Sequence, residues 1–384
     1  MPLQDLLESA VTDGTVPGAA ALVARGDEVE TASAGEFAPD SIARIASVTK
    51  PIMAAAVMLL VDEGRVSLHD QVARWLPELA APHVVRTPES PIEDVVPAAR
   101  EITIEDLLTF RAGWGFPSDF SLPAVIDLFA KLPVFGPGEA PDEWLVTLSR
   151  VPLLHQPGEA WLYNTCSDIQ GVLVARVSGR SLPDFLAERI FEPLGMVDTG
   201  FYVPSEKRDR LPTQHGWDFV VPDEGLWLEP PIFPSGAGGL VSTLADLHRF
   251  GRMLLADGGG LLSPESVRLM TTDHLTQEQR DASNLFLEGA GWGYGGAVRD
   301  DGRYGWTGGT GTSAYIVPAT GSVAILLTQV GVTSPVTGRR RSGCRRGSRR
   351  TGRRCPRSDA GRGRCRSSSR AGSTGTRAAG RAGR

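Results

Sequence analysis

The composition of the C-terminal residues limits how much of the chain can fold. Residues 339–384 contain 17 arginines, no lysine and one acidic residue, Asp359, and they include no Leu, Ile, Val, Met or aromatic side chain. Such a segment cannot bury enough apolar surface to offset the conformational entropy that folding removes. We therefore expect a folded body that ends near residue 338, followed by a disordered Arg-rich tail over 339–384.

The tail has two interpretations. Clustered arginines neutralise phosphates, so it could serve as an arm for nucleic acid or another anionic surface. It could also be an appendage without function, such as a GC-rich sequence read out of frame. No aromatic residue is interleaved to stack on bases, so we favour the second interpretation and expect no nucleic-acid partner. Without the tail, the body carries a net charge of −22, against −6 for the whole chain.

The body has no sequence feature of a membrane protein. Its longest apolar run, residues 52–61, is shorter than the roughly 20 residues that cross a bilayer. Residues 1–14 resemble a short amphipathic helix rather than a signal peptide, because no basic segment precedes an apolar core. We expect a cytoplasmic protein with no membrane partner.

The order of patterns along the body predicts an α+β fold. Two strands joined by a Gly-Asp turn precede an apolar helix that ends near Gly64, and strands return after residue 289. Helices and long loops lie between. This order predicts an antiparallel β-sheet flanked by helices and interrupted by an all-helical insertion. We place the sheet domain at 1–65 and 288–338, and the insertion at 66–287.

A serine and a lysine stand three residues apart in "ARIASVTKP", directly before the apolar run. At this spacing on a helix, Ser47 and Lys50 share a face. The alternative is a helix cap followed by a surface lysine. Lysine is rare here, however: the chain has 36 arginines and only Lys50, Lys131 and Lys207. Only lysine can lose its proton inside a protein, so Lys50 is a candidate base for a Ser47 nucleophile.

Two further segments could complete such a site. "PGEAWLYNT" places Tyr163 just before a helix that ends at Gly179, and "WTGGTG" is a strand that becomes glycine-rich at Gly308 and Gly309. Glycines let the backbone approach a substrate and present N–H groups to an oxyanion.

The six histidines show no metal-binding spacing, so we expect no metal and no cofactor.

In this order, "RIASVTKP", "PGEAWLYNT", "GAGGLVSTLADLHRF" and "WTGGTG" resemble the serine β-lactamase and penicillin-recognising superfamily. Within it, the sequence is most similar to class C-like serine hydrolases and family VIII carboxylesterases. The resemblance extends from about residue 5 to residue 330. It implies a β-lactamase/transpeptidase-like fold, with the active site between the sheet and the helical insertion.

The resemblance also implies roles for individual residues. Ser47 matches the nucleophile, Lys50 its base partner and Tyr163 the tyrosine that shares proton transfer. Trp306, Thr307 and Gly308 align with the third motif, and the N–H of Gly309 would form the oxyanion hole with that of Ser47.

Two departures from the family pattern bear on the substrate. The third motif begins with Trp306 where β-lactamases have a cation that binds the substrate carboxylate. The second motif has Thr165 where an asparagine would bind the acyl amide. An ester substrate requires neither the carboxylate-binding cation nor the amide-binding asparagine. We therefore expect hydrolysis of short-chain carboxylic esters through an acyl-enzyme. The alternatives are a β-lactamase or D,D-peptidase that takes a β-lactam-like substrate, and an inactive member.

In the resembled fold, a C-terminal helix packs on the sheet. Here the last strand leads into the Arg-rich tail, whose glycines and like charges oppose helix formation. We therefore expect the strand at 323–330 to keep one face poorly covered.

Overall fold

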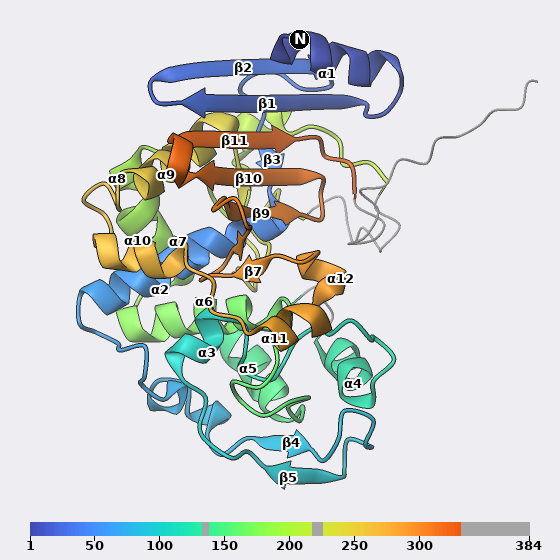
Figure 1. Cartoon of the computed structure of the whole chain (residues 1–384), viewed down its shortest axis with the longest axis vertical. Helices are drawn as coiled ribbons and strands as arrows, with labels where there is room; N and C mark the ends of the chain where they lie inside the picture. The colour runs from blue at the N-terminus through green and yellow to red at the C-terminus, as the bar shows by residue number, and fades with distance from the viewer. Residues whose placement is uncertain (133–137, 217–225, 332–384) are drawn as a thin grey trace, which may run out of the picture. The chain divides into compact units, whose positions relative to one another are not determined.

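A seven-stranded antiparallel sheet joins the two ends of the described chain (Figure 1). Its order is β2-β1-β11-β10-β9-β8-β7, and every neighbouring pair is antiparallel. The strands are β1 (Gly18–Arg25), β2 (Glu28–Gly35), β7 (Gly291–Trp292), β8 (Ala297–Val298), β9 (Tyr304–Gly308), β10 (Thr312–Val317) and β11 (Ser322–Leu327). The predicted α+β fold with an antiparallel sheet built from both ends of the body is confirmed.

This computed structural model describes residues 1–132, 138–216 and 226–331. The Arg-rich tail lies outside these residues, so its disorder stays a prediction. None of the described helices is long and apolar enough to cross a membrane.

The first two strands form the predicted hairpin. Arg25 pairs with Glu28 across a two-residue Gly26-Asp27 turn. Gly26 has a φ of +58°, and a type II′ hairpin turn requires glycine at this first turn position. β1 then pairs with β11 on its other side, so the hairpin forms one edge of the sheet.

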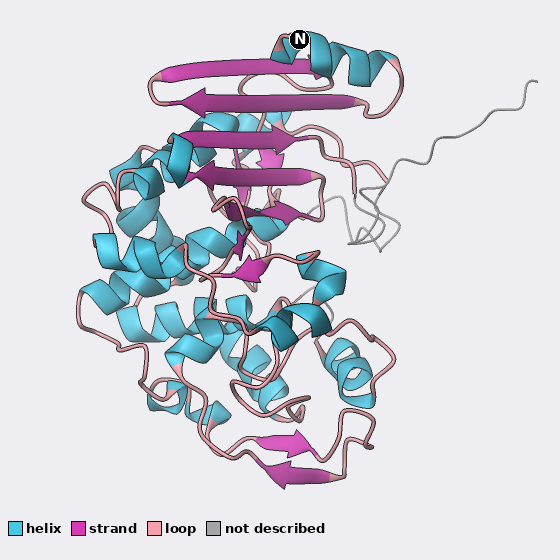
Figure 2. Ribbon diagram, viewed as in Figure 1, coloured by secondary structure: helices cyan, strands magenta, loops and turns pink. Residues whose placement is uncertain are grey.

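Helices pack against this sheet and make up the larger part of the remaining structure (Figure 2). They are α1 (Leu3–Thr12), α2 (Thr49–Asp62), α3 (Ile104–Leu108), α4 (Pro123–Lys131), α5 (Pro141–Ser149), α6 (Thr165–Ser178), α7 (Leu182–Leu186), α8 (Glu192–Leu194), α9 (Leu244–Leu255), α10 (Pro264–Met270), α11 (Gln277–Ala282) and α12 (Asn284–Leu287). Two short strand pairs accompany them: β3 (Ala43–Arg44) with β6 (Val241–Ser242), and β4 (His83–Val85) with β5 (Val95–Pro97).

Helix α2 forms the centre of the core. Its residues from Thr49 to Leu60 are buried on all sides, as expected of a helix that is apolar around its whole circumference. It packs against α6 and α10 and also contacts β9. The helix that begins with the predicted serine–lysine pair is therefore held in place by both the sheet and the helical region.

Helix α9 covers the inner face of the sheet. Thr243 caps it by accepting the N–H of Asp246 at 3.2 Å, and α9 contacts β1, β10 and β11. Gly251 comes so close to the sheet that an added Cβ would approach the Val323 side chain within 3.0 Å. We placed α9 within the helical insertion at 66–287, yet it packs on the sheet. The exact domain boundaries stay a prediction.

The outer face of the sheet is only partly covered. Helix α1 packs Leu7 onto Ala19, Ala21 and Ala32. Farther along, β11 alternates between buried and exposed residues, and Leu326 is 38% exposed. Val23, on the same face of the neighbouring β1, is 45% exposed. The predicted poorly covered face is confirmed for the described part of the chain.

Candidate active site

The nucleophile candidate lies in a sharply bent link between β3 and α2. Ala46 has a φ of +43°, which is uncommon for a residue with a side chain and marks local strain. The preceding backbone is tightly held: the Gln329 side chain accepts from the N–H of Arg44 and donates to its carbonyl, each at 3.1 Å. Ser47, which follows, is partly exposed. The fold therefore fixes this serine while leaving it accessible.

The turn between β9 and β10 contacts the same link. Thr310 Oγ1 donates to the carbonyl of Arg44 at 2.5 Å, and Thr312 Oγ1 donates to that of Ile45 at 2.9 Å. A Cβ on Gly308 would lie 2.4 Å from the Ile45 carbonyl oxygen, so only glycine fits. Beside Gly309, by contrast, the position of a Cβ has no heavy atom within 4 Å. The glycine-rich motif is thus brought next to Ser47, with open space at Gly309.

Lys50 is fully buried and directed at Ser47. Its Nζ lies 2.9 Å from Ser47 Oγ, 3.0 Å from Asn164 Oδ1 and 2.5 Å from the carbonyl oxygen of Ala237. The amide and carbonyl oxygens can only accept hydrogen bonds. In the neutral amine they take its two N–H groups, so the lone pair faces the Ser47 hydroxyl. The predicted pair therefore has the geometry of a base and its nucleophile.

Burial favours the neutral form of the Lys50 amine. Desolvation lowers the pKa of Lys50 to about 7, and the negative charge of Asp168 opposes this shift. An ammonium in water titrates near 10.4. Near neutral pH, a substantial fraction of Lys50 is therefore free to accept a proton.

Tyr163 is the third predicted catalytic residue. Trp306 Nε1 donates to its hydroxyl at 2.7 Å, and Lys50 Nζ lies 4.6 Å from the centre of its ring. Burial raises the pKa of Tyr163 to about 12, although hydrogen bonds with Ser47 and Trp306 act in the opposite direction. Tyr163 is therefore a neutral phenol at pH 7, which suits a proton relay better than a base.

Asn164 belongs to the site, although the sequence analysis singled out only its neighbours Tyr163 and Thr165. It has φ +84° and ψ −68°, the conformation of a rare, strained γ-turn. The N–H of Thr165 closes this turn onto the Tyr163 carbonyl at 3.3 Å. The turn lets Tyr163 and Asn164 both reach Lys50.

Asp168 was missed in the sequence. Its carboxylate accepts from Ser235 Oγ at 2.7 Å and from the N–H of Ala237 at 3.0 Å. Ala237 is the residue whose carbonyl receives Lys50, so Asp168 fixes one acceptor of the lysine. Burial raises the pKa of Asp168, while its hydrogen bonds lower it. An acidic residue in the first turn of α6, five positions after Tyr163, was the only sequence signal.

The other predicted binding residues lie in different environments. Thr307 is exposed on β9. Trp306 is buried, with its ring edge-on to Trp292 at 4.9 Å, so its indole supports Tyr163 in addition to any contact with substrate. Thr165 is buried at the start of α6, and among the described contacts its hydroxyl makes no hydrogen bond to Ser47 or Lys50. The roles of these residues, and of Gly309, stay predictions.

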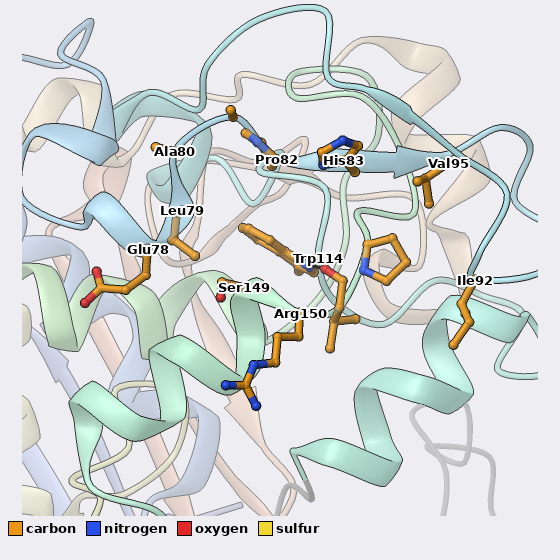
Figure 3. A pocket seen from close by; sticks show the side chains of 13 residues that line it. Glu78, Leu79, Ala80, Pro82, His83, Ile92, Val95, Trp114, Ser149 and Arg150 are labelled. Atoms are coloured by element: carbon orange, nitrogen blue, oxygen red, sulfur yellow. Dashed lines mark hydrogen bonds between the residues drawn. The ribbon is translucent and has the colours of Figure 1, made fainter.

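A cavity of about 230 Å³ lies elsewhere, near β4 and α5 (Figure 3). Trp114 lines it and donates from Nε1 to the Val151 carbonyl at 2.8 Å. None of the predicted site residues lines it. Within the described ranges, no three His, Cys, Asp or Glu side chains gather as a metal site would require.

Comparisons with known proteins find similarity along most of the chain. A family model described as Beta-lactamase matches residues 3–342. Protein Rv1367c of Mycobacterium tuberculosis is 38% identical, over 76% of this chain and 78% of its own. Esterase EstB of Burkholderia gladioli is 29% identical, over 87% of this chain and 92% of its own.

Among solved structures, EstCE1, a hydrolase with promiscuous acyltransferase activity, superposes with a TM-score of 0.72. It covers 85% of this chain and 92% of its own at 24% identity. That similarity shows the fold, which is the one that the sequence motifs implied.

Proposed function

This chain belongs to the beta-lactamase family as a serine hydrolase, and we propose that it cleaves short-chain carboxylic esters through an acyl-serine intermediate. The observation that carries the proposal is the arrangement of Lys50. Two fixed oxygen acceptors hold its amine, and the remaining direction points at Ser47 Oγ.

The reaction follows from this arrangement. Neutral Lys50 accepts the Ser47 proton as Oγ attacks the ester carbonyl. Backbone N–H groups of Ser47 and Gly309 bind the tetrahedral oxyanion. As the C–O bond to the alcohol breaks, the proton passes from Lys50 through the Tyr163 hydroxyl to the departing oxygen. Water then attacks the acyl-serine by the same route, which releases the acid and restores the Ser47 hydroxyl.

Two observations favour an ester over a β-lactam. The third motif presents the neutral indole of Trp306, bonded to Tyr163, where a cation would bind the substrate carboxylate. A relative that covers most of this chain is named an esterase. A simple ester has neither a carboxylate for such a cation to bind nor an acyl amide.

The test compares p-nitrophenyl butyrate with nitrocefin, using the wild type and Ser47→Ala. We expect the ester to have the higher kcat/KM and Ser47→Ala to abolish its turnover while circular dichroism shows an unchanged fold. Intact-protein mass spectrometry should detect a butyryl adduct on the wild type only. Preferential turnover of nitrocefin would favour a β-lactamase, and an absence of turnover with both substrates would indicate an inactive member.

A further inference from the structure

Aromatic side chains form a continuous cluster of ring contacts that begins at Tyr163. Its ring stacks on Phe286 with centroids 4.8 Å apart, and Phe286 lies 6.1 Å from Phe120. Phe116 contacts Tyr163, Phe120 and Phe129 with centroids between 4.7 and 6.2 Å apart. We call these four residues, Phe116, Phe120, Phe129 and Phe286, the aromatic patch.

The patch is accessible at its outer end. Phe120 is 41% exposed, and the other three members are partly buried. Exposing a phenylalanine ring to water is unfavourable. A flat apolar group of a bound substrate would cover the ring and remove its surface from water. Phe120 contacts Phe116 and Phe286, the two patch residues that pack on Tyr163, so its exposure favours a ligand contact at this end of the patch.

The patch is also held rigidly. Phe116 and Tyr163 exchange two backbone hydrogen bonds, at 2.9 and 3.1 Å. Ser118 Oγ donates to the carbonyl of Ala282 at 2.7 Å, which ties the loop of Phe120 to the segment just before α12 and Phe286. Figure 1 shows α12 and α4, which carry Phe286 and Phe129, on the same side of the described unit. A surface fixed in this way binds without ordering itself first.

The position of the patch relative to the proton relay indicates whether it contacts the acyl part or the alcohol part of an ester. Lys50 Nζ lies 4.6 Å from the centre of the Tyr163 ring, and the ring of Phe286 stacks on the same ring with centroids 4.8 Å apart, so the patch adjoins the tyrosine of the proton relay. The Tyr163 hydroxyl delivers the proton to the departing oxygen. The oxyanion lies toward Gly309, on the β9–β10 turn, so the alcohol must leave on the side of Tyr163.

From this geometry we infer that the aromatic patch is the subsite for the alcohol part of the substrate, and that it selects esters whose alcohol carries an aromatic ring. The inference rests on the proposed ester hydrolysis and adds the class of leaving group. The acyl part stays short and contacts other residues.

The experiment uses esters whose alcohols have similar acidity, so that leaving-group chemistry does not mask binding. We would measure kcat/KM for 2-phenylethyl butyrate, 2-cyclohexylethyl butyrate and ethyl butyrate, and for ethyl 3-phenylpropanoate, which carries its ring on the acyl side. We expect 2-phenylethyl butyrate to exceed its cyclohexyl analogue by about fivefold, which is the size of a favourable aromatic contact. The ring on the acyl side should give no such gain over ethyl butyrate.

Variants assign the effect to the patch. Phe120→Leu keeps an apolar side chain but removes the ring, so the phenyl-to-cyclohexyl ratio should fall to near one. Val197→Ala, at a 73% exposed apolar position outside the patch, is the control and should leave the ratio unchanged. Phe286→Leu provides a second substitution, at the patch residue that stacks on Tyr163.

The outcomes separate this inference from the proposed function. Hydrolysis of all esters without an aromatic preference, or a preference for the ring on the acyl side, overturns the assignment of the patch and leaves ester hydrolysis intact. A ratio that survives both Phe120→Leu and Phe286→Leu overturns it as well. Failure to hydrolyse any ester overturns both.

Discussion

Lys50 shows how one residue can depend on the whole fold for its chemistry. Its three hydrogen-bond partners come from the short turn before α2, from the residue before α6 and from the loop before β6. An amine in this position is useful only if it can lose its proton, and burial without a direct carboxylate partner favours that loss. The scarcity of lysine in the sequence pointed to Lys50, but the partners that tune it could not be identified there.

Replacing Lys50 by arginine should therefore be severe although the positive charge is kept. A guanidinium cannot act as a base, so we expect Lys50→Arg to lower kcat/KM for p-nitrophenyl butyrate by about a thousandfold. Lys131→Arg, whose lysine is ion-paired to Asp127 at 2.6 Å on the surface, is the matched control and should match the wild type. An active Lys50→Arg enzyme would mean that the lysine contributes charge alone.

The pH dependence should report on Lys50 and Asp168 together. In the wild type, kcat/KM should rise with pH through a pKa of about 7, because only neutral Lys50 accepts the Ser47 proton. The charge of Asp168 raises that pKa, so Asp168→Asn should shift the rising limb to lower pH.

Ser235→Ala provides the control for this shift. It removes one hydrogen bond to Asp168 but leaves the carboxylate in place, so the rising limb of kcat/KM should move to lower pH by less than it does in Asp168→Asn. If Asp168→Asn reduces the rate but leaves the limb unchanged, the residue supports the backbone only.

At the scale of elements, strand β9 links the substrate side of the site to its proton relay. Trp306 donates its indole N–H to Tyr163 and packs on Trp292. Trp306→Phe keeps a ring but removes the donor, so we expect kcat to fall by about fivefold, the cost of one neutral hydrogen bond. Trp292→Phe is the control, because the Trp292 indole N–H has no hydrogen-bond partner in the described structure. Equal effects of the two substitutions would show that ring packing is what matters.

The elements themselves were largely predictable. Three local features each leave a signature in the sequence: the Gly-Asp turn between the first two strands, the apolar run of α2, and the glycine after α6, Gly179 at φ +71°. The β4–β5 pair was missed because each strand is only three residues long and its sequence is rich in proline.

The rest of the site depends on contacts between distant segments. Lys50 meets Asn164 across 114 positions and Ala237 across 187, and no local pattern records such pairs. The serine, lysine and tyrosine were found because their motifs are short and ordered. Asn164 and Asp168, which orient the lysine, required the structure.

For the molecule as a whole, the exposed outer face of the sheet should affect its behaviour in solution. Apolar side chains on an open sheet favour association. The double substitution Val23→Thr and Leu326→Thr should therefore raise the concentration at which light scattering detects aggregates, with little change in Tm, because both positions are exposed. Ile325→Thr on the buried face of the same strand is the control and should lower Tm clearly. Unchanged aggregation in the double variant would mean that this face is covered in solution.

The pairing of β1 with β11 joins Ala20 to Leu327, and it has a consequence for biosynthesis. A ribosome adds roughly 5–20 residues per second, so about 15–60 s pass between the two strands. During that time the β1–β2 hairpin emerges with its inner edge unpaired, and the turn that carries Gly309 has not yet been made. Ser47 and Lys50 therefore exist long before they can act, and a nascent chain becomes an enzyme only when nearly all of its folded part has left the ribosome.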